Sequence, residues 1–334
     1  MNTRRLRVGV AGAGHFGRYH ALKLAASARG ELVGVHDRNP ERARLVAAEA
    51  GGRALSFPEL LAACEAVVVA VPAASHHALG VAALRAGRHV LMEKPIAATL
   101  GQADELAALA CASGLVLQVG HLERFSAAHG AILSRAGAPL YIEASRSGPF
   151  KVRGTDVSVV LDLMIHDLDL VLELAGSPIE AVEAVGAPVA SARVDLANAR
   201  LRFASGAVAT LSASRVAPRV ERRMRVFGAR GCVAVDFAER RLSVTARDRG
   251  EKLAGLPGFG TETVSWQERD ALEAEQAAFI AAVLDGTPVA VDAAAGRRAL
   301  AAALRVEAAI AEARGRVHAS GLLKDSEHRV GGGL

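Results

Sequence analysis

The feature that most constrains the fold is a glycine-rich turn at residues 12–17, which reads Gly-Ala-Gly-His-Phe-Gly. An apolar run rich in valine precedes it at residues 6–11, and an amphipathic, alanine-rich segment follows at residues 18–27. Glycines spaced in this way between a strand and a helix let the chain turn tightly and let its backbone approach a pyrophosphate at the helix N-terminus. The turn therefore predicts a βαβ unit that binds a dinucleotide. A glycine turn without a ligand is the competing interpretation.

An acidic residue follows the turn at the spacing expected for ribose recognition. Asp37 lies 20 positions after Gly17 and ends the apolar run at 31–37. A carboxylate there can bond the adenosine ribose hydroxyls, and it repels the 2′-phosphate of NADP. We therefore predict NAD as the cofactor, with NADP possible because Arg38 is adjacent. The cofactor-binding residues predicted in this part are Gly12, Gly14, His15, Phe16, Gly17, Asp37 and Arg38.

The rhythm of the chain changes near residue 120, and this change predicts two domains. Before it, short apolar runs alternate with amphipathic segments, as in βαβ units with a parallel sheet. After it, strand-like segments separated by glycine, proline or charge predict an antiparallel sheet with one solvated face. The predicted strands are 6–11, 31–37, 53–57, 66–71, 89–93 and 115–119, then 139–147 and several between 179 and 246. The predicted helices are about 157–175, 267–284 and 294–313, with an extended return between the last two.

The predicted fold class is α/β, with an N-terminal Rossmann domain that holds a doubly wound parallel sheet. A C-terminal α+β domain with a large, mainly antiparallel open sheet follows it. We place the dinucleotide-binding domain at residues 1–121 and the substrate-binding and oligomerisation domain at residues 122–315. The helix near 294–313 is expected to pack back on the Rossmann domain. Residues 316–334 are polar and rich in glycine, which predicts a flexible tail.

Composition limits the classes of protein to which the chain can belong. With 334 residues, 51% of them hydrophobic, it can bury the cores of two domains. The net charge is +5, but the arginines are scattered and aromatic residues make up only 4%, so we expect no nucleic-acid partner. We expect no membrane span, because no apolar run reaches about 18 residues. We also expect no signal peptide, because the basic N-terminus runs directly into the glycine-rich turn without an apolar stretch and a small-residue cleavage site. Three widely separated cysteines, Cys64, Cys111 and Cys232, fit reduced thiols and a cytoplasmic location.

The apolar run at 161–170, LDLMIHDLDL, contains four ionisable groups. On a regular helix Asp162, His166 and Asp169 share one face, while Asp167 turns away. An aspartate and a histidine four residues apart can hydrogen-bond, which orients the ring for proton transfer near neutral pH. A metal site is an alternative for this face, and we predict none because no further histidine or cysteine cluster converges on it. Pairing of Asp167 and Asp169 with nearby arginines remains the structural alternative.

A lysine follows the predicted strand at 89–93, in the sequence Glu93-Lys94-Pro95. The carboxyl ends of parallel strands are where open α/β sheets bind ligands. Pro95 restricts Lys94 to an extended conformation, so the direction of its side chain is defined. A solvated strand end is the competing interpretation of this lysine.

The order of these motifs resembles the glucose-fructose oxidoreductase, inositol dehydrogenase and rhizopine catabolism (Gfo/Idh/MocA) family. The similar stretches are the glycine turn, VPAASHH at 71–77, AGRHVLMEKP at 86–95 and DxxxHDLD at 162–169, and the resemblance extends from about residue 4 to 315. It implies a Rossmann domain and NAD(P)-dependent oxidation or reduction of a sugar, cyclitol or related alcohol. It also implies a second domain whose open sheet often mediates oligomers, so we expect a homodimer or homotetramer.

The resemblance also implies roles for individual residues. His166 corresponds to the general base and acid, Lys94 to the residue that polarises the substrate oxygen, and Asp162 to a residue that orients or holds the substrate and a cation. Pro72, His76, Glu93 and Lys94 correspond to residues near the cofactor, and the peptide before Pro95 is often cis in the family. Ala73 stands where asparagine is common, which puts one polar cofactor contact in doubt.

The stretch from Gln118, QVGHLERFSAAHGAI, resembles the GHxERFNP stretch of a family branch of nucleotide-sugar 3-dehydrogenases, particularly those acting on UDP-N-acetylglucosamine. His121, Glu123 and Arg124 match it and are predicted to bind substrate together with Asp162 and His166, whereas Ser126-Ala127 replaces Asn-Pro. We therefore expect 3-dehydrogenation of a UDP-N-acetylamino sugar. A dehydrogenase of free sugars or inositol, and a non-catalytic NAD(P)-binding sensor, are the alternatives. Candidate cations for the substrate diphosphate are Arg124, Lys151, Arg153 and Arg215.

Overall fold

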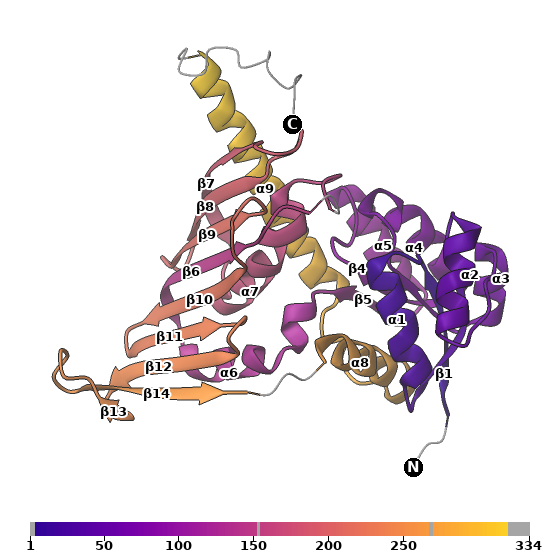
Figure 1. The fold of residues 1–334 in the computed structure, drawn as a ribbon, viewed down its shortest axis with the longest axis horizontal. Coiled ribbons are helices and arrows are strands. Elements are labelled where there is room, and N and C mark those ends of the chain that lie inside the picture. Colours follow the sequence, from indigo (N-terminus) through magenta and orange to yellow (C-terminus); the bar gives the residue numbers. More distant parts are fainter. Residues whose placement is uncertain (1–3, 152–153, 267–269, 320–334) are drawn as a thin grey trace. The chain divides into compact units, whose positions relative to one another are not determined.

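The chain forms two compact units in the computed structural model, which describes residues 4–151, 154–266 and 270–319. The first unit contains the described residues up to 131 and those from 266 to 301. The second contains those from 132 to 265 and from 302 onward. Figure 1 colours the chain along its sequence and labels many of the helices and strands of both units. Within the described ranges, no helix combines the length and the apolar character needed to cross a membrane.

The first unit is built on a sheet of five parallel strands in the order β2-β1-β3-β4-β5. Strands β3 and β5 are buried along their whole length, as in a sheet with helices on both faces. The strand order reverses at β1 and β3, and this switch point is where open α/β sheets bind ligands. The arrangement confirms the predicted Rossmann sheet. The strands are β1 (Leu6–Ala11), β2 (Gly30–His36), β3 (Ala66–Val69), β4 (His89–Glu93) and β5 (Leu117–Gly120).

The predicted strand at 53–57 is wrong. Ala54 forms only a single parallel bridge to β2, and helix α3 (Phe57–Ala63) begins directly afterwards. Ser56 and Glu59 form a capping box: the Ser56 hydroxyl accepts a hydrogen bond from the Glu59 amide, and the Glu59 carboxylate accepts one from the Ser56 amide at 2.8 Å. This local cap begins a helix at Phe57, the last residue of the predicted strand, so the strand is reduced to the bridge at Ala54.

Helices of the first unit share one apolar core with the sheet. Val8 and Val10 of β1 belong to the same buried cluster as Phe279 and Ile280 of α8, although about 270 residues separate them. Helix α8 is therefore part of this unit. The helices are α1 (His15–Ala26), α2 (Pro40–Glu49), α3, α4 (His76–Arg85), α5 (Leu100–Ala112) and α8 (Ala271–Asp285), with the short 3-10 helices η1 (Ala73–Ser75) and η2 (Leu122–Phe125).

Two helices have residues in both units, namely α6 (Ala127–Ala136) and α9 (Ala293–Ala319). Helices α8 and α9 match the predictions at 267–284 and 294–313, although residues 267–269 lie outside the described residues. The expected return between them is extended, and the Val119 amide donates to the Val291 carbonyl at 2.9 Å. Within the predicted tail at 316–334, residues 316–319 continue α9, and the remainder lies outside the described residues.

The second unit is built on a nine-stranded sheet in the order β13-β14-β12-β11-β10-β6-β9-β8-β7 (Figure 1). Among the strands that the structure describes in this sheet, only β6 and β9 pair in parallel, which confirms the mainly antiparallel sheet. Burial alternates along β8, so one face is covered and the other is solvated. Strand β14 was not predicted because its sequence, FGTETVS, shows little apolar pattern. The strands are β6 (Pro139–Ser147), β7 (Ile179–Ala187), β8 (Leu196–Phe203), β9 (Val208–Ser214), β10 (Glu221–Gly228), β11 (Gly231–Asp236), β12 (Arg241–Arg247), β13 (Glu251–Lys252) and β14 (Phe259–Ser265).

A buried hydrogen-bond chain joins α8, α1 and β4 in the first unit. His20 is fully buried on α1, and its Nε2 lies 3.0 Å from Glu93 Oε1. The Gln276 side-chain nitrogen lies 3.0 Å from His20 Nδ1 and 3.1 Å from the His20 carbonyl oxygen. Because an amide nitrogen donates to a carbonyl, this contact orients Gln276 and makes His20 Nδ1 an acceptor. The His20 proton therefore resides on Nε2 and is donated to Glu93.

A second carboxyl group, Glu275, is buried beside this chain. It is fully buried, and neither of its side-chain oxygens has a hydrogen-bond partner among the described residues. One ligand atom from each of His20, Glu93 and Glu275 lies within 4.8 Å of the others, a donor set that could hold a metal ion. A histidine binds metal through a nitrogen that carries no proton, whereas here Nε2, the atom facing Glu93, is protonated. The geometry therefore favours a proton over a metal ion among His20, Glu93 and Glu275.

The pKa values of the two carboxyl groups, Glu93 and Glu275, are shifted in opposite directions. Burial raises the pKa of Glu275 well above its ordinary value, and the negative charge of Glu93 raises it further. Burial also opposes ionisation of Glu93, but the hydrogen bond from His20 and the nearby positive charges outweigh it and lower the pKa of Glu93. We conclude that Glu93 is the anion and Glu275 the neutral acid.

The variant Glu275→Gln should become more stable relative to the wild-type protein as pH rises. Because the folded-state pKa is raised, the folded protein holds a proton that the unfolded chain has lost above the ordinary value of 4.5. Wild-type stability thus falls with pH between these two pKa values, with a limiting slope of about 1.4 kcal/mol per pH unit. In urea unfolding from about pH 5 to pH 8, the advantage of Glu275→Gln should grow with pH.

The matched control is Glu273→Gln on the same helix, where the side chain is 71% exposed. Its unfolding free energy should follow the wild-type pH dependence. A stability difference between Glu275→Gln and wild type that stays constant across this pH range would contradict the protonated state of Glu275.

Candidate functional site

The glycine turn has the geometry of a phosphate cradle. Gly12 has a φ of +108°, and a Cβ there would lie 2.2 Å from the Ala70 carbonyl oxygen at the end of β3. A Cβ on Gly17 would lie 1.8 Å from the Gly12 carbonyl oxygen, so only glycine lets α1 approach β1 this closely. In contrast, no atom lies within 4 Å of the Cβ position on Gly14. That open space, directly before the N-terminus of α1, is where a pyrophosphate would fit.

Asp37 lies beside this turn, as predicted from the spacing. Its Oδ2 accepts a hydrogen bond from the Ala13 amide at 2.7 Å, and its Oδ1 accepts one from the Asn39 amide at 2.8 Å. The carboxylate therefore ties the end of β2 to the glycine turn. This position suits hydrogen bonding to ribose hydroxyls of a dinucleotide whose phosphates lie at Gly14.

The other residues predicted near the turn lie at the surface or close to it. Arg38 and Pro72 are exposed, and Pro72 precedes the 3-10 helix η1. His15 begins α1, and its ring contacts the edges of Phe16 and Tyr19 at centroid distances of 5.8 and 4.9 Å. Phe16 is 39% exposed. These four predicted cofactor contacts remain predictions.

The peptide that carries Lys94 is held by buried hydrogen bonds. The Lys94–Pro95 bond is cis, as the resemblance implied. The Lys94 amide donates to Glu93 Oε2 at 3.2 Å, while Glu93 Oε1 faces His20. The cofactor contact predicted for Glu93 remains a prediction. The structure shows that Glu93 fixes the backbone of Lys94 from inside the unit.

His76 holds the other side of this peptide. Its Nδ1 lies 2.7 Å from the Pro95 carbonyl oxygen, and its Nε2 lies 2.8 Å from the Val71 carbonyl oxygen. Burial lowers the pKa of His76, although hydrogen bonding to the two carbonyls opposes this shift. His76 is only 1% exposed. Its two ring nitrogens therefore contact, from inside the unit, the backbone that follows β3 and the backbone that follows β4.

The residues predicted from the GHLERF stretch also belong to the first unit. His121 is buried, and Glu123 and Arg124 are half-buried on the 3-10 helix η2. Ser126 ends this helix, and its hydroxyl donates to the Glu123 carbonyl oxygen at 2.8 Å. Thus Ser126, which replaces the asparagine of the similar branch, has a local structural contact.

In the second unit, the segment with four ionisable groups departs from the regular helix that was expected. Residues Val160–Met164 form a π-helix, and α7 (Ile165–Ala175) follows it directly. A 100° rotation per residue therefore does not apply around Asp162, and the predicted common face with Asp169 is not a regular one. Asp162 and His166 are half-buried, whereas Asp169 is 1% exposed. Wide helical turns of this type occur frequently at functional sites.

Asp167 belongs to the fold and not to the proposed chemistry. It is 3% exposed, and the Arg146 guanidinium on β6 donates to both of its oxygens, at 3.0 and 2.8 Å. This bidentate pair fixes α7 on the sheet. The alternative of an aspartate paired with an arginine is therefore confirmed for Asp167.

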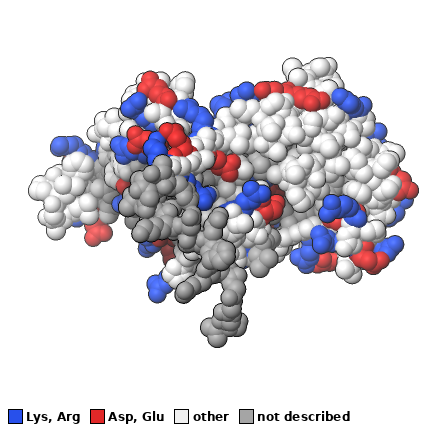
Figure 2. Space-filling model, turned by 90° about the horizontal axis from the view of Figure 1, so that it is seen from above, with Lys and Arg blue, Asp and Glu red and all other residues white. Residues whose placement is uncertain are grey.

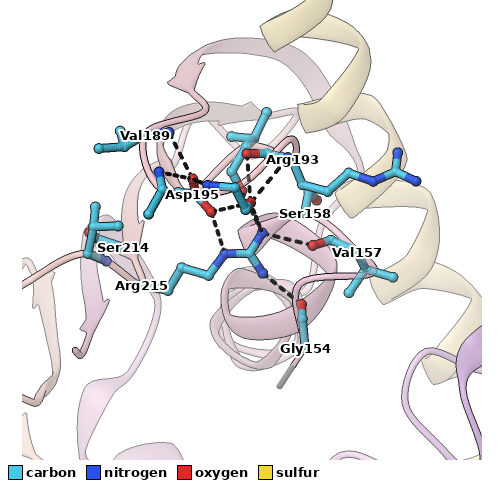
Figure 3. A network of polar contacts seen from close by, with 12 residues as sticks. Gly154, Val157, Ser158, Val189, Arg193, Asp195, Ser214 and Arg215 are labelled. Carbon is cyan, nitrogen blue, oxygen red and sulfur yellow. Dashed lines mark hydrogen bonds and ion pairs between the residues drawn. The ribbon is translucent and has the colours of Figure 1, made fainter. Parts of the chain in front are cut away.

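Arg215 was a candidate for binding a substrate diphosphate, and this prediction is wrong. The side chain is 5% exposed, and its guanidinium donates to Asp195 Oδ1 and to the carbonyl oxygens of Gly154 and Val157 (Figure 3). Asp195 therefore neutralises the charge of Arg215, and partners inside the second unit accept most of the hydrogen bonds that its guanidinium can donate. Of the other candidates, Lys151 is exposed, and Arg153 lies outside the described residues.

Sequence reasoning missed several residues that shape these sites. His20 shares the buried face of α1 with Gly17, Ala21 and Leu24, so a histidine on an apolar face was the available signal. Glu275 lies on an alanine-rich helix where glutamate is usually solvated, and nothing in the sequence separated it from its neighbours. The same holds for Gly154, whose importance depends on contacts with distant residues.

Charges of both signs are interspersed over the described part of the face shown in Figure 2. Surface arginines pair with carboxylates in many places, as in Arg18 with Glu49 and Arg29 with Asp285. Such pairs contribute little to stability individually.

Comparison with known proteins agrees with both units. Residues 6–121 match the oxidoreductase family GFO_IDH_MocA with its NAD-binding Rossmann fold, and residues 129–234 match the GFO/IDH/MocA C-terminal domain. UDP-N-acetylglucosamine 3-dehydrogenase of Acidithiobacillus ferrooxidans is 44% identical over 310 residues, which cover 91% of this chain and 97% of that protein. The scyllo-inositol 2-dehydrogenase (NAD(+)) of Bacillus subtilis is 27% identical, covering 86% of this chain and 89% of the relative.

A solved structure gives the same result. UDP-N-acetylglucosamine 3-dehydrogenase GnnA from Acidithiobacillus ferrooxidans superposes with a TM-score of 0.87 at 43% identity, covering 92% of this chain and 97% of that one. The two matched domains follow each other in the order that the motifs indicated. The glycine turn lies in the first matched domain, and helix α7 with His166 lies in the second. The chain therefore belongs to the Gfo/Idh/MocA family of NAD-binding oxidoreductases.

Proposed function

We propose that the protein is an NAD-dependent dehydrogenase that oxidises the 3-hydroxyl of a UDP-N-acetylamino sugar such as UDP-N-acetylglucosamine. The observation that carries the substrate is the 44% identity to a UDP-N-acetylglucosamine 3-dehydrogenase over 97% of its length. Relatives that act on inositol are more distant, as the 27% identity of the Bacillus subtilis scyllo-inositol enzyme illustrates. The GHLERF stretch supports the same branch.

The cradle at Gly12–Gly17 fits the pyrophosphate of a nicotinamide dinucleotide, and Asp37 fits the hydroxyls of its adenosine ribose. When bound, the nicotinamide supplies the hydride chemistry of the reaction. NAD is the proposed form because the Asp37 carboxylate would repel a 2′-phosphate. Arg38 is exposed and follows Asp37 directly, so it is the residue that could moderate this preference.

We assign the protein's own part of the reaction to three side chains. The Lys94 ammonium donates a hydrogen bond to the substrate oxygen and stabilises negative charge on it. His166 takes the hydroxyl proton on a ring nitrogen as the alcohol becomes a ketone, and it returns the proton in the reverse direction. Asp162, four positions earlier, orients His166 or the substrate. Positioning and electrostatics are the contribution of this chain.

The exposed face of the nine-stranded sheet is the proposed contact between copies of the chain. It has a depression of about 540 Å³ lined by residues of β6 and β9–β12, among them Tyr141, Thr210, Arg223 and Ser243. A homodimer or homotetramer formed through this face follows the family expectation. Sedimentation of the purified protein would measure it.

The substrate is tested by adding NAD and UDP-N-acetylglucosamine to the purified protein and following nicotinamide absorbance. We expect turnover, with a kcat/KM at least about 100-fold higher than for free N-acetylglucosamine, because hydrogen bonds to a charged diphosphate are worth about 1.5–3 kcal/mol each. Detection of a 3-keto sugar by NMR would identify the carbon. Turnover of myo-inositol or free sugars without turnover of the nucleotide sugar would overturn this substrate.

The proposed proton-transfer group and oxygen ligand are tested by Lys94→Met and His166→Asn. Each should lower kcat by about 10²- to 10⁴-fold, since it removes a group that acts in the transition state. NAD affinity, measured by calorimetry, should change little for His166→Asn. Lys252→Met, at an exposed lysine on β13, is the control that should keep wild-type kcat. A kcat within twofold of wild type for either site variant would remove that residue from the mechanism.

The NAD preference is tested at Asp37 with two variants. Asp37→Asn removes the charge but keeps an oxygen that can accept from the Ala13 amide, so it should improve the kcat/KM for NADP by about tenfold or more. Asp37→Ala removes both contacts and should also weaken NAD binding. An unchanged ratio of NAD to NADP efficiency in both variants would show that cofactor choice lies elsewhere.

A further inference from the structure

We propose that Arg215, Asp195 and Gly154 are positioning residues for Asp162. In this assignment the ion pair between Arg215 and Asp195 fixes the backbone of Gly154, and that backbone determines where the Asp162 carboxylate lies. All four residues belong to the second unit. The inference rests on the proposed catalytic role of Asp162.

Asp195 is a buried anion held mainly by the backbone. It is fully buried, and its Oδ2 accepts hydrogen bonds from the amides of Val189, Ala190 and Ser191 at 2.7 to 2.8 Å. The Ser191 hydroxyl donates to Oδ1 at 2.7 Å. Burial opposes its charge, but these donors and Arg215 outweigh burial and hold the pKa of Asp195 far below the ordinary range. The carboxylate is therefore a fixed point of negative charge.

Arg215 extends from this fixed point to the chain that precedes the π-helix (Figure 3). Its Nε donates to Asp195 Oδ1 at 2.7 Å, Nη1 donates to the Gly154 carbonyl oxygen at 2.7 Å, and Nη2 donates to the Val157 carbonyl oxygen at 3.0 Å. A planar guanidinium makes these three contacts with one rigid group. The segment from 154 to 157 is thereby fixed at two carbonyls.

That segment lies against Asp162. Gly154 has a φ of +82°, and a Cβ there would lie 2.8 Å from Asp162 Oδ2 and 3.2 Å from Asp162 Cγ. The Asp162 amide in turn donates to the Ser158 carbonyl oxygen at 3.0 Å. Gly154 thus forms one wall of the space that the Asp162 carboxylate occupies, and any shift of Gly154 changes that space.

The ion pair between Arg215 and Asp195 positions the Asp162 carboxylate without adding net charge beside it. Asp195 neutralises Arg215 at 2.7 Å, so the pair presents mainly its geometry to the segment that it holds. A buried pair of this kind contributes little to stability compared with apolar packing of similar volume. What it supplies is a defined backbone path beside a residue proposed to act in catalysis.

Two glycine variants test the contact with Asp162. Gly154→Ala places a methyl group against the carboxylate, whereas Gly206→Ala, in the turn between β8 and β9, meets no atom within 4 Å. The backbone strain is matched, because the φ angles are +82° and +86°. We expect similar losses of melting temperature, but only Gly154→Ala should lower kcat, by about 10- to 100-fold, and alter its pH profile, with the dissociation constant for NAD unchanged.

A third variant tests the ion pair. Arg215→Lys keeps the charge beside Asp195 but cannot reach both carbonyls, so kcat should fall about tenfold at temperatures well below its melting point. A kcat for Gly154→Ala equal to that of Gly206→Ala, or an Arg215→Lys variant that loses only thermal stability, would overturn the positioning role.

These measurements use whichever alcohol the wild-type enzyme oxidises, so they do not depend on the nucleotide sugar. Turnover of inositol alone would overturn the proposed substrate and leave the comparison of variants valid. The variant Asp162→Asn distinguishes a failure of the catalytic role of Asp162 from a failure of the positioning role alone. If its kcat equals that of wild type, the catalytic role of Asp162 and the inference both fall. If its kcat falls while Gly154→Ala stays active, only the positioning role falls.

Discussion

The hydrogen bond between His20 and Glu93 is the interaction on which the first unit most depends. It joins the helix behind the nucleotide cradle to the strand that ends at Lys94, and Gln276 extends it to α8. It also decides which of two neighbouring carboxyl groups is charged. Because Glu93 is the anion, it can accept from the Lys94 amide, and the backbone of Lys94 is fixed from within the core. One buried contact thus links cofactor binding, the proposed oxygen ligand and a distant C-terminal helix.

The parts of the fold that depend on local chemistry could be predicted from sequence. The cradle was predictable because a Cβ on Gly12 or Gly17 would clash with the backbone, whereas Gly14 leaves space for a phosphate. Asp37 follows at the spacing typical of a βαβ unit that binds a dinucleotide. The open antiparallel sheet was predictable from alternation, as in β8. The strand expected at 53–57 is reduced to a single bridge at Ala54, because the Ser56 capping box begins a helix at Phe57.

The site could be predicted only as far as residue type and spacing determine it. Lys94 and His166 stand out because charge is unusual at a buried strand end or in an apolar helix. The π-helix at Asp162 has no signal of its own, since a regular helix accommodates the same residues. Arg215 and Gly154 depend on long-range pairing: an arginine that binds a phosphate and one that binds Asp195 look alike in sequence.

The way Asp195 is held limits how this part of the protein can change during evolution. Backbone amides, the Ser191 hydroxyl and Arg215 together keep its carboxylate ionised, so losing Arg215 alone would leave a buried carboxylate without its countercharge. Losing Asp195 alone would leave a buried guanidinium instead. Neither single replacement is a neutral step, and among homologues the two positions should therefore be retained together or exchanged together.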